Sequence, residues 1–249
     1  MKTKTAILTA LWLVAPLLFA QTSNVITMDQ EPHHHLALHN AYVKVFNVEV
    51  SPGDSIILHR HDQDTIAIAI GEQLVTVGIP GKPDVHQKNA DAQVRLQRGG
   101  YMHSTRVDGD TQYHTIAVEL LHPQTNFHNV CAEVLPGQPL NCPDAAAKAS
   151  SAFASQALLE SNETRVRLVR IPPHQSANLG EVSPAGEAPQ LIVALDAASI
   201  SSKSRQPPIK SLQPGDFEWI EGGHNPARVL QNSADKEARF IEILPTPQP

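Results

Sequence analysis

The sequence is poor in aromatic residues, in cysteine and in positive charge. Aromatic side chains make up 4% of its 249 residues, there are two cysteines, and 19 lysines and arginines stand against 25 aspartates and glutamates. The net charge of −6, with no basic stripe, makes nucleic acid an unsuitable partner. The sequence also lacks a Gly-x-Ser-x-Gly elbow, a glycine-rich phosphate loop and a His-Glu-x-x-His motif, so no common catalytic signature is present.

The sequence does contain enough apolar residues to fold and an unusual number of histidines. Hydrophobic residues make up 41% of the chain, which supports a packed core and excludes a wholly disordered protein. The length fits one large domain or two small ones. Eleven of the 13 histidines lie between His33 and His128. Because histidine is the commonest metal ligand in proteins, we expect the chemistry in the first half.

Residues 1–20 have the features of a signal peptide. Lys2 and Lys4 form a positive start, residues 6–19 are apolar, and Ala20 is a small residue at a plausible cleavage point. A transmembrane anchor would need about 20 apolar residues, and this run is shorter and is interrupted by Pro16. We therefore expect an exported protein, periplasmic or secreted, that has no contact with the membrane after cleavage.

The two cysteines predict a disulfide. Cys131 and Cys142 are separated by ten residues that include Pro136, Gly137 and Pro139, which let the chain turn back on itself. The pair suits the oxidising compartment of an exported protein. The alternatives are two free thiols or a metal site, but a thiolate zinc site favours a tighter Cys-x-x-Cys spacing.

The segment from residue 41 to residue 121 alternates between apolar and polar residues with a period of two. Such runs cover residues 42–50, 65–70, 74–77, 94–96 and 115–120, and turn residues rich in glycine, proline and aspartate separate them. Short strands with turns at this spacing predict a β-sandwich or a β-barrel. The shortage of aromatic residues does not oppose this, because valine and isoleucine fill such cores.

The second half repeats the first. Residues 123–143 form a linker, and the alanine-rich residues 144–160, with Asp144 as a potential cap, predict a helix, or alternatively a flexible tether. Strand patterns resume at residues 166–171, 191–195, 217–220, 228–230 and 240–244. Residues 48–52 match 169–173, and residues 96–99 match 212–215, so the chain contains two related β units.

Three histidines form a metal-binding pattern. His59 and His61 are two residues apart, so in a strand their imidazoles project from one face. His103 follows the turn at residues 99–100 and adds a third ligand. Three protein ligands leave coordination positions open for water or substrate, as catalytic metal sites require.

These motifs resemble those of the cupin superfamily. Gly53, five residues, His59-x-His61 and a later Gly71 follow the first cupin motif, and Gly100-x-x-His103 follows the second. The resemblance implies an all-β protein of two tandem double-stranded β-helix (jelly-roll) barrels, a bicupin. The barrels would span residues 41–122 and 165–245, with residues 21–40 as a flexible arm and residues 123–164 as a linker containing the disulfide and a short helix.

The resemblance also implies a cofactor, one divalent transition metal bound by His59, His61 and His103. Imidazole ligands suit iron, zinc, copper or nickel, and an added carboxylate would favour iron or manganese. Cupins include oxygenases, isomerases and non-enzymatic binding or storage proteins. We therefore expect a small organic substrate or ligand, and either a metal-dependent oxygenase or isomerase or a binding protein without catalysis.

The sequence departs from the cupin pattern at several positions. The glutamate of the first motif is replaced by Asp64 or Thr65, depending on the direction of counting, and Asp64 is a candidate fourth ligand if its side chain points inward. The asparagine that closes the second motif is replaced by Val107. In the second unit, the ligand positions are Gly180, Val182 and Arg228. The second barrel is therefore expected to bind no metal.

The remaining histidines have weaker roles. His114 is a candidate acid/base or supporting group that lines the cavity, because it lies on the last strand of the first unit. Residues 33–35 are three consecutive histidines that we assign to an exposed arm, where they would bind metal only adventitiously. An exposed β edge would allow the protein to form homo-oligomers.

Overall fold

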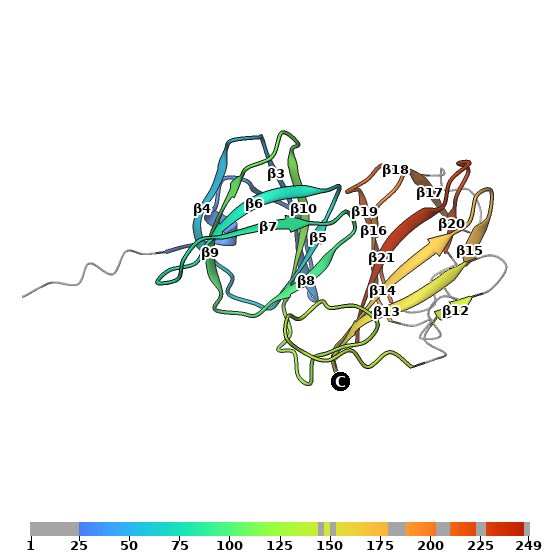
Figure 1. Cartoon of the computed structure of the whole chain (residues 1–249). Coiled ribbons are helices and arrows are strands. Elements are labelled where there is room, and N and C mark those ends of the chain that lie inside the picture. The colour runs from blue at the N-terminus through green and yellow to red at the C-terminus, as the bar shows by residue number, and fades with distance from the viewer. Residues whose placement is uncertain are drawn as a thin grey trace, which may run out of the picture.

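The computed structural model describes residues 25–143, 147–149, 153–178, 188–202, 210–222 and 228–246. Figure 1 shows two β domains side by side, the first in blue to green and the second in yellow to red. The one helix in this part of the chain is the 3-10 turn η1 (Met28–Gln30), and no helix there is long and apolar enough to cross a membrane. The expected signal peptide, Gly180 and Val182 lie outside the described residues.

The first domain consists of two five-stranded sheets. One has the order β1 (Ile26–Thr27), β4 (Ser55–Arg60), β9 (Met102–Val107), β6 (Gln73–Gly78) and β7 (Val85–Asn89). The other has the order β2 (His34–His39), β3 (Val43–Val50), β10 (Tyr113–Leu120), β5 (Thr65–Ala69) and β8 (Val94–Gln97).

The second domain also has two sheets. The larger has the order β11 (His128–Asn129), β13 (Ala154–Glu160), β14 (Thr164–Ile171), β21 (Ala238–Pro245), β16 (Gln190–Ala194) and β19 (Phe217–Ile220), with β12 (Ala147–Ala149) paired to β13. The smaller has the order β15 (Ser176–Asn178), β20 (Arg228–Gln231), β17 (Ala198–Ser202) and β18 (Lys210–Leu212).

The two domains repeat one strand arrangement, which confirms the predicted tandem β-barrel fold. In the first, β10 lies between β3 and β5, and in the second β21 lies between β14 and β16. Even the registers correspond, because Glu119 pairs with Lys44 across β10 and β3, and Glu242 pairs with Arg167 across β21 and β14. The repeat found in the sequence is therefore a repeat of the sheet itself.

One hydrophobic core holds the two domains together. On β5, Ile66 and Ile68 point away from the first barrel and pack in a cluster that includes Leu191 and Ile243 of the second. All four side chains are fully buried. Further members from the first domain are Val43, Val45, Ile116 and Val118, and from the second Leu159, Val166, Val193 and Ile241. Because these sheet faces bury each other, the alternate residues of every central strand point into a barrel.

The predicted helix over residues 144–160 is wrong in the part that the structure describes. Residues 154–160 form β13, which pairs with β14 along its length and carries Leu158 and Leu159 into the shared core. Alanine-rich sequence favours a helix locally, but the strands on both sides of β13 offer backbone partners and the shared core offers apolar burial, and these outweigh the helix propensity.

The flexible arm predicted over residues 21–40 is also wrong for residues 25–40. Strand β1 pairs with β4, strand β2 pairs with β3, and Met28 between them is buried in the first barrel. Both strands extend sheet edges, so this segment is ordered by backbone hydrogen bonds that its short polar sequence does not reveal.

The linker that follows the first barrel contains the disulfide Cys131–Cys142, with the Cα atoms 4.6 Å apart. The loop that it closes lies along β8, where the carbonyl of Val134 accepts a hydrogen bond from Leu96 N–H at 2.9 Å. Val134 itself is buried in the shared core. A disulfide closing a loop of this size contributes about 2–4 kcal/mol.

The second barrel contains a buried carboxyl group that should make stability depend on pH. Glu242 is fully buried, and neither of its carboxylate oxygens has a hydrogen-bond partner among the described residues. Burial raises its pKa to about 7, although the positive charge of Arg167 acts in the opposite direction. A group with a raised pKa stabilises the fold when it is protonated, and this contribution is lost as the pH rises toward and through 7.

We predict that Glu242→Gln removes part of this pH dependence. The free energy of unfolding of the wild type should fall between pH 5 and pH 8, with up to about 3 kcal/mol of the fall due to Glu242. The variant should lose that part and be the more stable protein at pH 8. Denaturant titrations at both pH values measure this, with the exposed Glu237→Gln as control. An unchanged slope in the Glu242 variant would contradict the assignment.

Candidate metal centre

Two neighbouring strands bring the three histidines together. His59 on β4 is directly opposite His103 on β9, and a β-bulge between Ile56 and His59 shifts the phase of β4. Because of this bulge, both Ile56 and His59 point into the barrel, while Ile57 between them is 51% exposed. His61 follows the end of β4, where its N–H donates to the carbonyl of Tyr101 at 2.9 Å.

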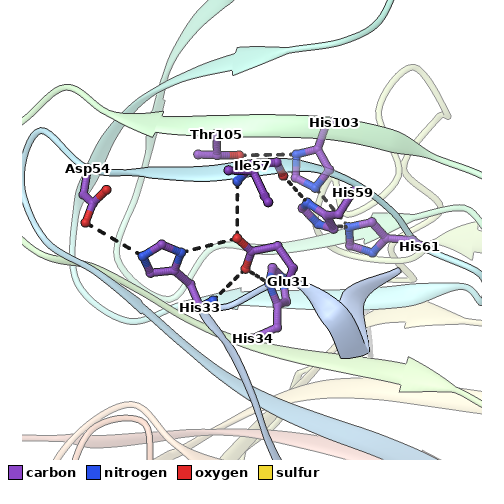
Figure 2. A network of polar contacts seen from close by, with 9 residues as sticks. All are labelled: Glu31, His33, His34, Asp54, Ile57, His59, His61, His103 and Thr105. Atoms are coloured by element: carbon purple, nitrogen blue, oxygen red, sulfur yellow. Dashed lines mark hydrogen bonds and ion pairs between the residues drawn. The ribbon is translucent and has the colours of Figure 1, made fainter. Parts of the chain in front are cut away.

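The imidazole rings converge through their Nε2 atoms. Nε2 of His61 lies 3.1 Å from that of His59 and 2.9 Å from that of His103. Figure 2 shows the three rings meeting at one point inside the barrel. Two ligands bound at right angles to a metal at about 2.1 Å are about 3 Å apart, so these spacings fit one ion. The same three residues form the only such cluster of histidine, cysteine or acidic side chains among the described residues.

The other ring nitrogen of each histidine, Nδ1, lies within hydrogen-bonding distance of a backbone carbonyl or a hydroxyl, which orients the ring. Nδ1 of His59 donates a hydrogen bond to the carbonyl of Ile57 at 2.9 Å, so the ring proton is on Nδ1 and the lone pair of Nε2 is free for a metal. Nδ1 of His61 lies 3.1 Å from the hydroxyl of Thr65, which donates to the carbonyl of Gln63 and so accepts from the ring. Nδ1 of His103 lies 3.3 Å from the hydroxyl of Thr105.

The environment keeps the three imidazoles neutral. Burial lowers the pKa of His59 to about 4, of His103 to about 3 and of His61 to about 2, and for His61 the neighbouring His103 and His59 lower it further. Histidine binds metals only in its neutral form. The free site is therefore in the protonation state that a metal requires over the whole physiological range of pH.

A carboxylate beside the site comes from the N-terminal segment. Glu31 is buried, and its Oε2 atom accepts from Nδ1 of His34 at 2.7 Å. Its Oε1 atom accepts a hydrogen bond from the N–H of Ile57 at 3.3 Å. Ile57 is also the residue whose carbonyl accepts the hydrogen bond from His59. The ring of His34 lies 4.7 Å from that of His59 (Figure 2). Burial alone raises the pKa of Glu31, but hydrogen bonds from His34 and His33 outweigh it and lower the pKa to about 2.

Sequence reasoning missed Glu31 and His34 because it placed them in an exposed arm. Of the three consecutive histidines, His34 is buried, His33 is half-buried and lies 3.3 Å from Glu31, and only His35 is exposed. A spacing of three residues between Glu31 and His34 carries no signal by itself. It gains meaning only when β1 and β2 are known to belong to the barrel.

Asp64, the candidate fourth ligand, is not part of the cluster. It shares a face of β5 with the isoleucines of the shared core, and its Oδ1 accepts from Gly99 N–H and from Arg98, both at 2.9 Å. Thr65 points inward instead and holds His61. Thr65 and not Asp64 lies beside the histidines because the face of β5 that includes Asp64 packs against the second domain.

His114, the candidate acid/base, does not line the cavity. It lies on the outer face of β10, where its Nε2 atom is 2.8 Å from Oδ1 of Asn47. Its ring contacts the turn at Gly215 in the second domain. A Cβ atom added to Gly215 would lie only 2.2 Å from Cε1 of His114. His114 is therefore a contact between the domains, and Gly215 is required to make room for it.

The second barrel has an apolar interior where the first has the metal site. Its core contains Phe153, Val169, Ile192 and Phe240. Asn232, four residues after Arg228, donates to the carbonyls of Ile171, Pro172 and Lys236 and braces the loop, whereas Val107 at the matching position of the first barrel is simply buried. Strand β20 contains Arg228, whose side chain lies outside the described residues.

A cavity of about 510 Å³ adjoins the histidines inside the first barrel. His103 lines it, and the small side chains of Ala67 and Ala69 leave it open. Its polar wall is a chain of amides in which Gln87 donates to Asn89 and Asn89 donates to Gln73. Arg98, Gly99 and Pro136, which are exposed, form part of the lining; Pro136 belongs to the disulfide loop. The volume is typical of a small-molecule site.

We predict that Thr65→Val weakens metal binding by about tenfold to a hundredfold, because the hydroxyl that orients His61 is lost while the size of the side chain is kept. Titration against a competing chelator measures the affinity. Thr115→Val is the matched control, since Thr115 is another buried threonine of the first barrel that is hydrogen-bonded to Gln73 but not to a histidine. Equal affinities in the two variants would contradict the role of Thr65.

No family model and no curated protein matches this sequence. Solved structures are similar to it. AerE from Microcystis aeruginosa matches with a TM-score of 0.56 and 13% identity, over 87% of this chain and 99% of that one. Salicylate 1,2-dioxygenase from Pseudoaminobacter salicylatoxidans, solved with gentisate, matches with a TM-score of 0.54 and 12% identity, over 82% and 68%. A cupin 2 conserved barrel domain protein from Leptotrichia buccalis matches with a TM-score of 0.52 and 7% identity, over 85% and 87%. At these identities the similarity establishes the fold, and this chain has the fold of the cupin superfamily.

Proposed function

We propose that the first barrel binds one divalent transition metal through His59, His61 and His103 and that this centre acts on a small organic molecule in the adjoining cavity. The observation that carries the proposal is the convergence of three neutral Nε2 atoms at one point, together with the position of one of the three rings, His103, in the lining of that cavity. A purely structural site would use a fourth protein ligand, and none lies in the cluster among the described residues.

The ligand set favours iron, zinc, copper or nickel, since it consists of imidazoles alone. When bound, such a metal supplies a Lewis acid, and a redox-active one also activates dioxygen. The chain's own residues do the rest of the work. Ile57, Thr65 and Thr105 keep the three rings oriented, and the cavity lining holds the substrate beside His103.

Oxygenase chemistry is the first version to test. The similar salicylate 1,2-dioxygenase was solved with gentisate, which supports a small organic substrate for this fold without identifying it. Isomerisation and binding without turnover are the competing versions. The absence of a carboxylate ligand from the described cluster is the observation that favours binding without turnover.

We predict about one equivalent of metal per chain in the purified protein, measured by elemental analysis. The double variant His59→Ala, His61→Ala should lose it, and the exposed His39→Ala should keep it. Removing residues 25–40 is not a suitable way to eliminate adventitious binding, because β1 and β2 belong to the barrel. A wild-type protein that contains no metal and cannot be loaded would contradict the proposal.

Assays of the metal-loaded protein then distinguish an oxygenase, an isomerase and a binding protein. Oxygen consumption with small phenols, diketones or thiols that is absent from the double variant supports an oxygenase. Product formation without oxygen uptake supports an isomerase, and saturable binding without any product supports a binding protein.

We also propose that the protein is exported. The pattern of residues 1–20 and the disulfide Cys131–Cys142 support this. Mass spectrometry of protein expressed with its full N-terminus in a bacterial host should find a chain shortened by about 20 residues outside the cytoplasm, and an intact chain in the cytoplasm would argue against export.

A further inference from the structure

The cavity beside the histidines contains an arginine without an acidic partner. Arg95 lies on β8 between Val94 and Leu96, which are both buried in the shared core, so its side chain has the opposite direction and enters the first barrel. It pairs with Ala67 across β5 and lines the cavity. The small side chain of Ala67 leaves the space in front of it open.

Arg95 differs in this respect from the other arginines of the first domain. Arg60, Arg98 and Arg106 each form an ion pair with an aspartate, at 2.6, 2.9 and 2.9 Å. Among the described residues, no aspartate or glutamate pairs with Arg95. The paired arginines are 43–56% exposed at their side chains, whereas Arg95 is half-buried. The arginine that is less exposed to water is therefore the one that lacks a counter-charge.

Among the described residues, no acidic side chain lines the cavity. Its polar lining consists of amides, hydroxyls, His103, Arg95 and, with the exposed residues, Arg98, whose charge is already neutralised by Asp64. Tyr101 and Tyr113 line the same cavity as Arg95. Arg95 therefore shares the cavity with two phenol hydroxyls that can donate hydrogen bonds. A partly buried positive charge with hydrogen-bond donors around it is stabilised by an anion.

We propose that Arg95 binds the carboxylate of a small organic acid whose other end reaches the metal site at His103. This deepens the proposed function and rests on it for the metal. The planar guanidinium presents two parallel N–H groups to a carboxylate, which fixes the orientation of the acid as well as its charge. Ala67 and Ala69 provide the room, and the amide chain ending at Gln73 gives the opposite wall a polar surface.

The test uses matched pairs of carboxylic acids and their primary amides as probes, namely benzoate with benzamide, 2-hydroxybenzoate with 2-hydroxybenzamide, and lactate with lactamide. Calorimetry or ligand-observed NMR measures their binding to the metal-loaded protein. At least one acid should bind about tenfold to a hundredfold more tightly than its amide. Arg95→Gln should abolish this preference, Arg95→Lys should keep part of it, and the exposed Arg106→Gln should keep all of it. Circular dichroism and metal content check that each variant is folded and loaded.

Two results would overturn the inference, and they differ from a failure of the proposed function. One is the absence of any acid preference in the wild type, and the other is a preference that survives in Arg95→Gln. If a surviving preference disappears when a chelator removes the metal, the acid binds the metal alone. If the protein binds no metal but still prefers acids through Arg95, the proposed function fails and the anion site remains.

Discussion

The burial of two β-sheets against each other is the constraint on which the rest of the structure depends. The outward faces of β3, β5, β8 and β10 are apolar and meet the corresponding faces of β14, β16 and β21 in one core. A sheet face of valine and isoleucine exposed to water would be costly at roughly 25 cal/mol for each Å². Since period two assigns alternate residues to opposite faces, this packing also decides which side chains enter each barrel.

The two barrel interiors have diverged although their strands correspond. In the second, apolar residues such as Val169 and Phe240 pack together. In the first, alanines at positions 67 and 69 leave a cavity, and a bulge in β4 turns His59 inward beside His103. Buried glutamates, Glu119 and Glu242, occupy equivalent positions opposite the partly buried Lys44 and Arg167 of the neighbouring strand, and burial raises the pKa of both carboxyl groups to about 7. The two interiors therefore share a buried glutamate at one position and differ in the residues around it, which are apolar in the second barrel and line a cavity in the first.

Segments outside the repeat complete the site. The N-terminal strands β1 and β2 close the edges of the first barrel and bring Glu31 behind the residue that holds His59. The disulfide loop covers β8 and contributes Pro136 to the lining of the cavity. Neither segment has a counterpart in the cupin motifs. Both are held in place by backbone hydrogen bonds to the edge strands of the first barrel.

The sequence by itself determined the features that depend on local spacing. Residues two apart on a strand share a face, so His59 and His61 could be paired without a structure, and the glycine spacing added His103. The internal repeat and the pairing of Cys131 with Cys142 were also readable. Only the tertiary structure decided which face of each strand points into the barrel. As a result, Thr65 and not Asp64 lies beside the histidines, His114 lies outside the cavity, and Arg95 lines it. The tertiary structure also decided that strands form within residues 25–40 and over residues 154–160, because pairing with β4, β3 and β14 and burial in the barrel and the shared core stabilise them, and local propensity contains no information about that burial.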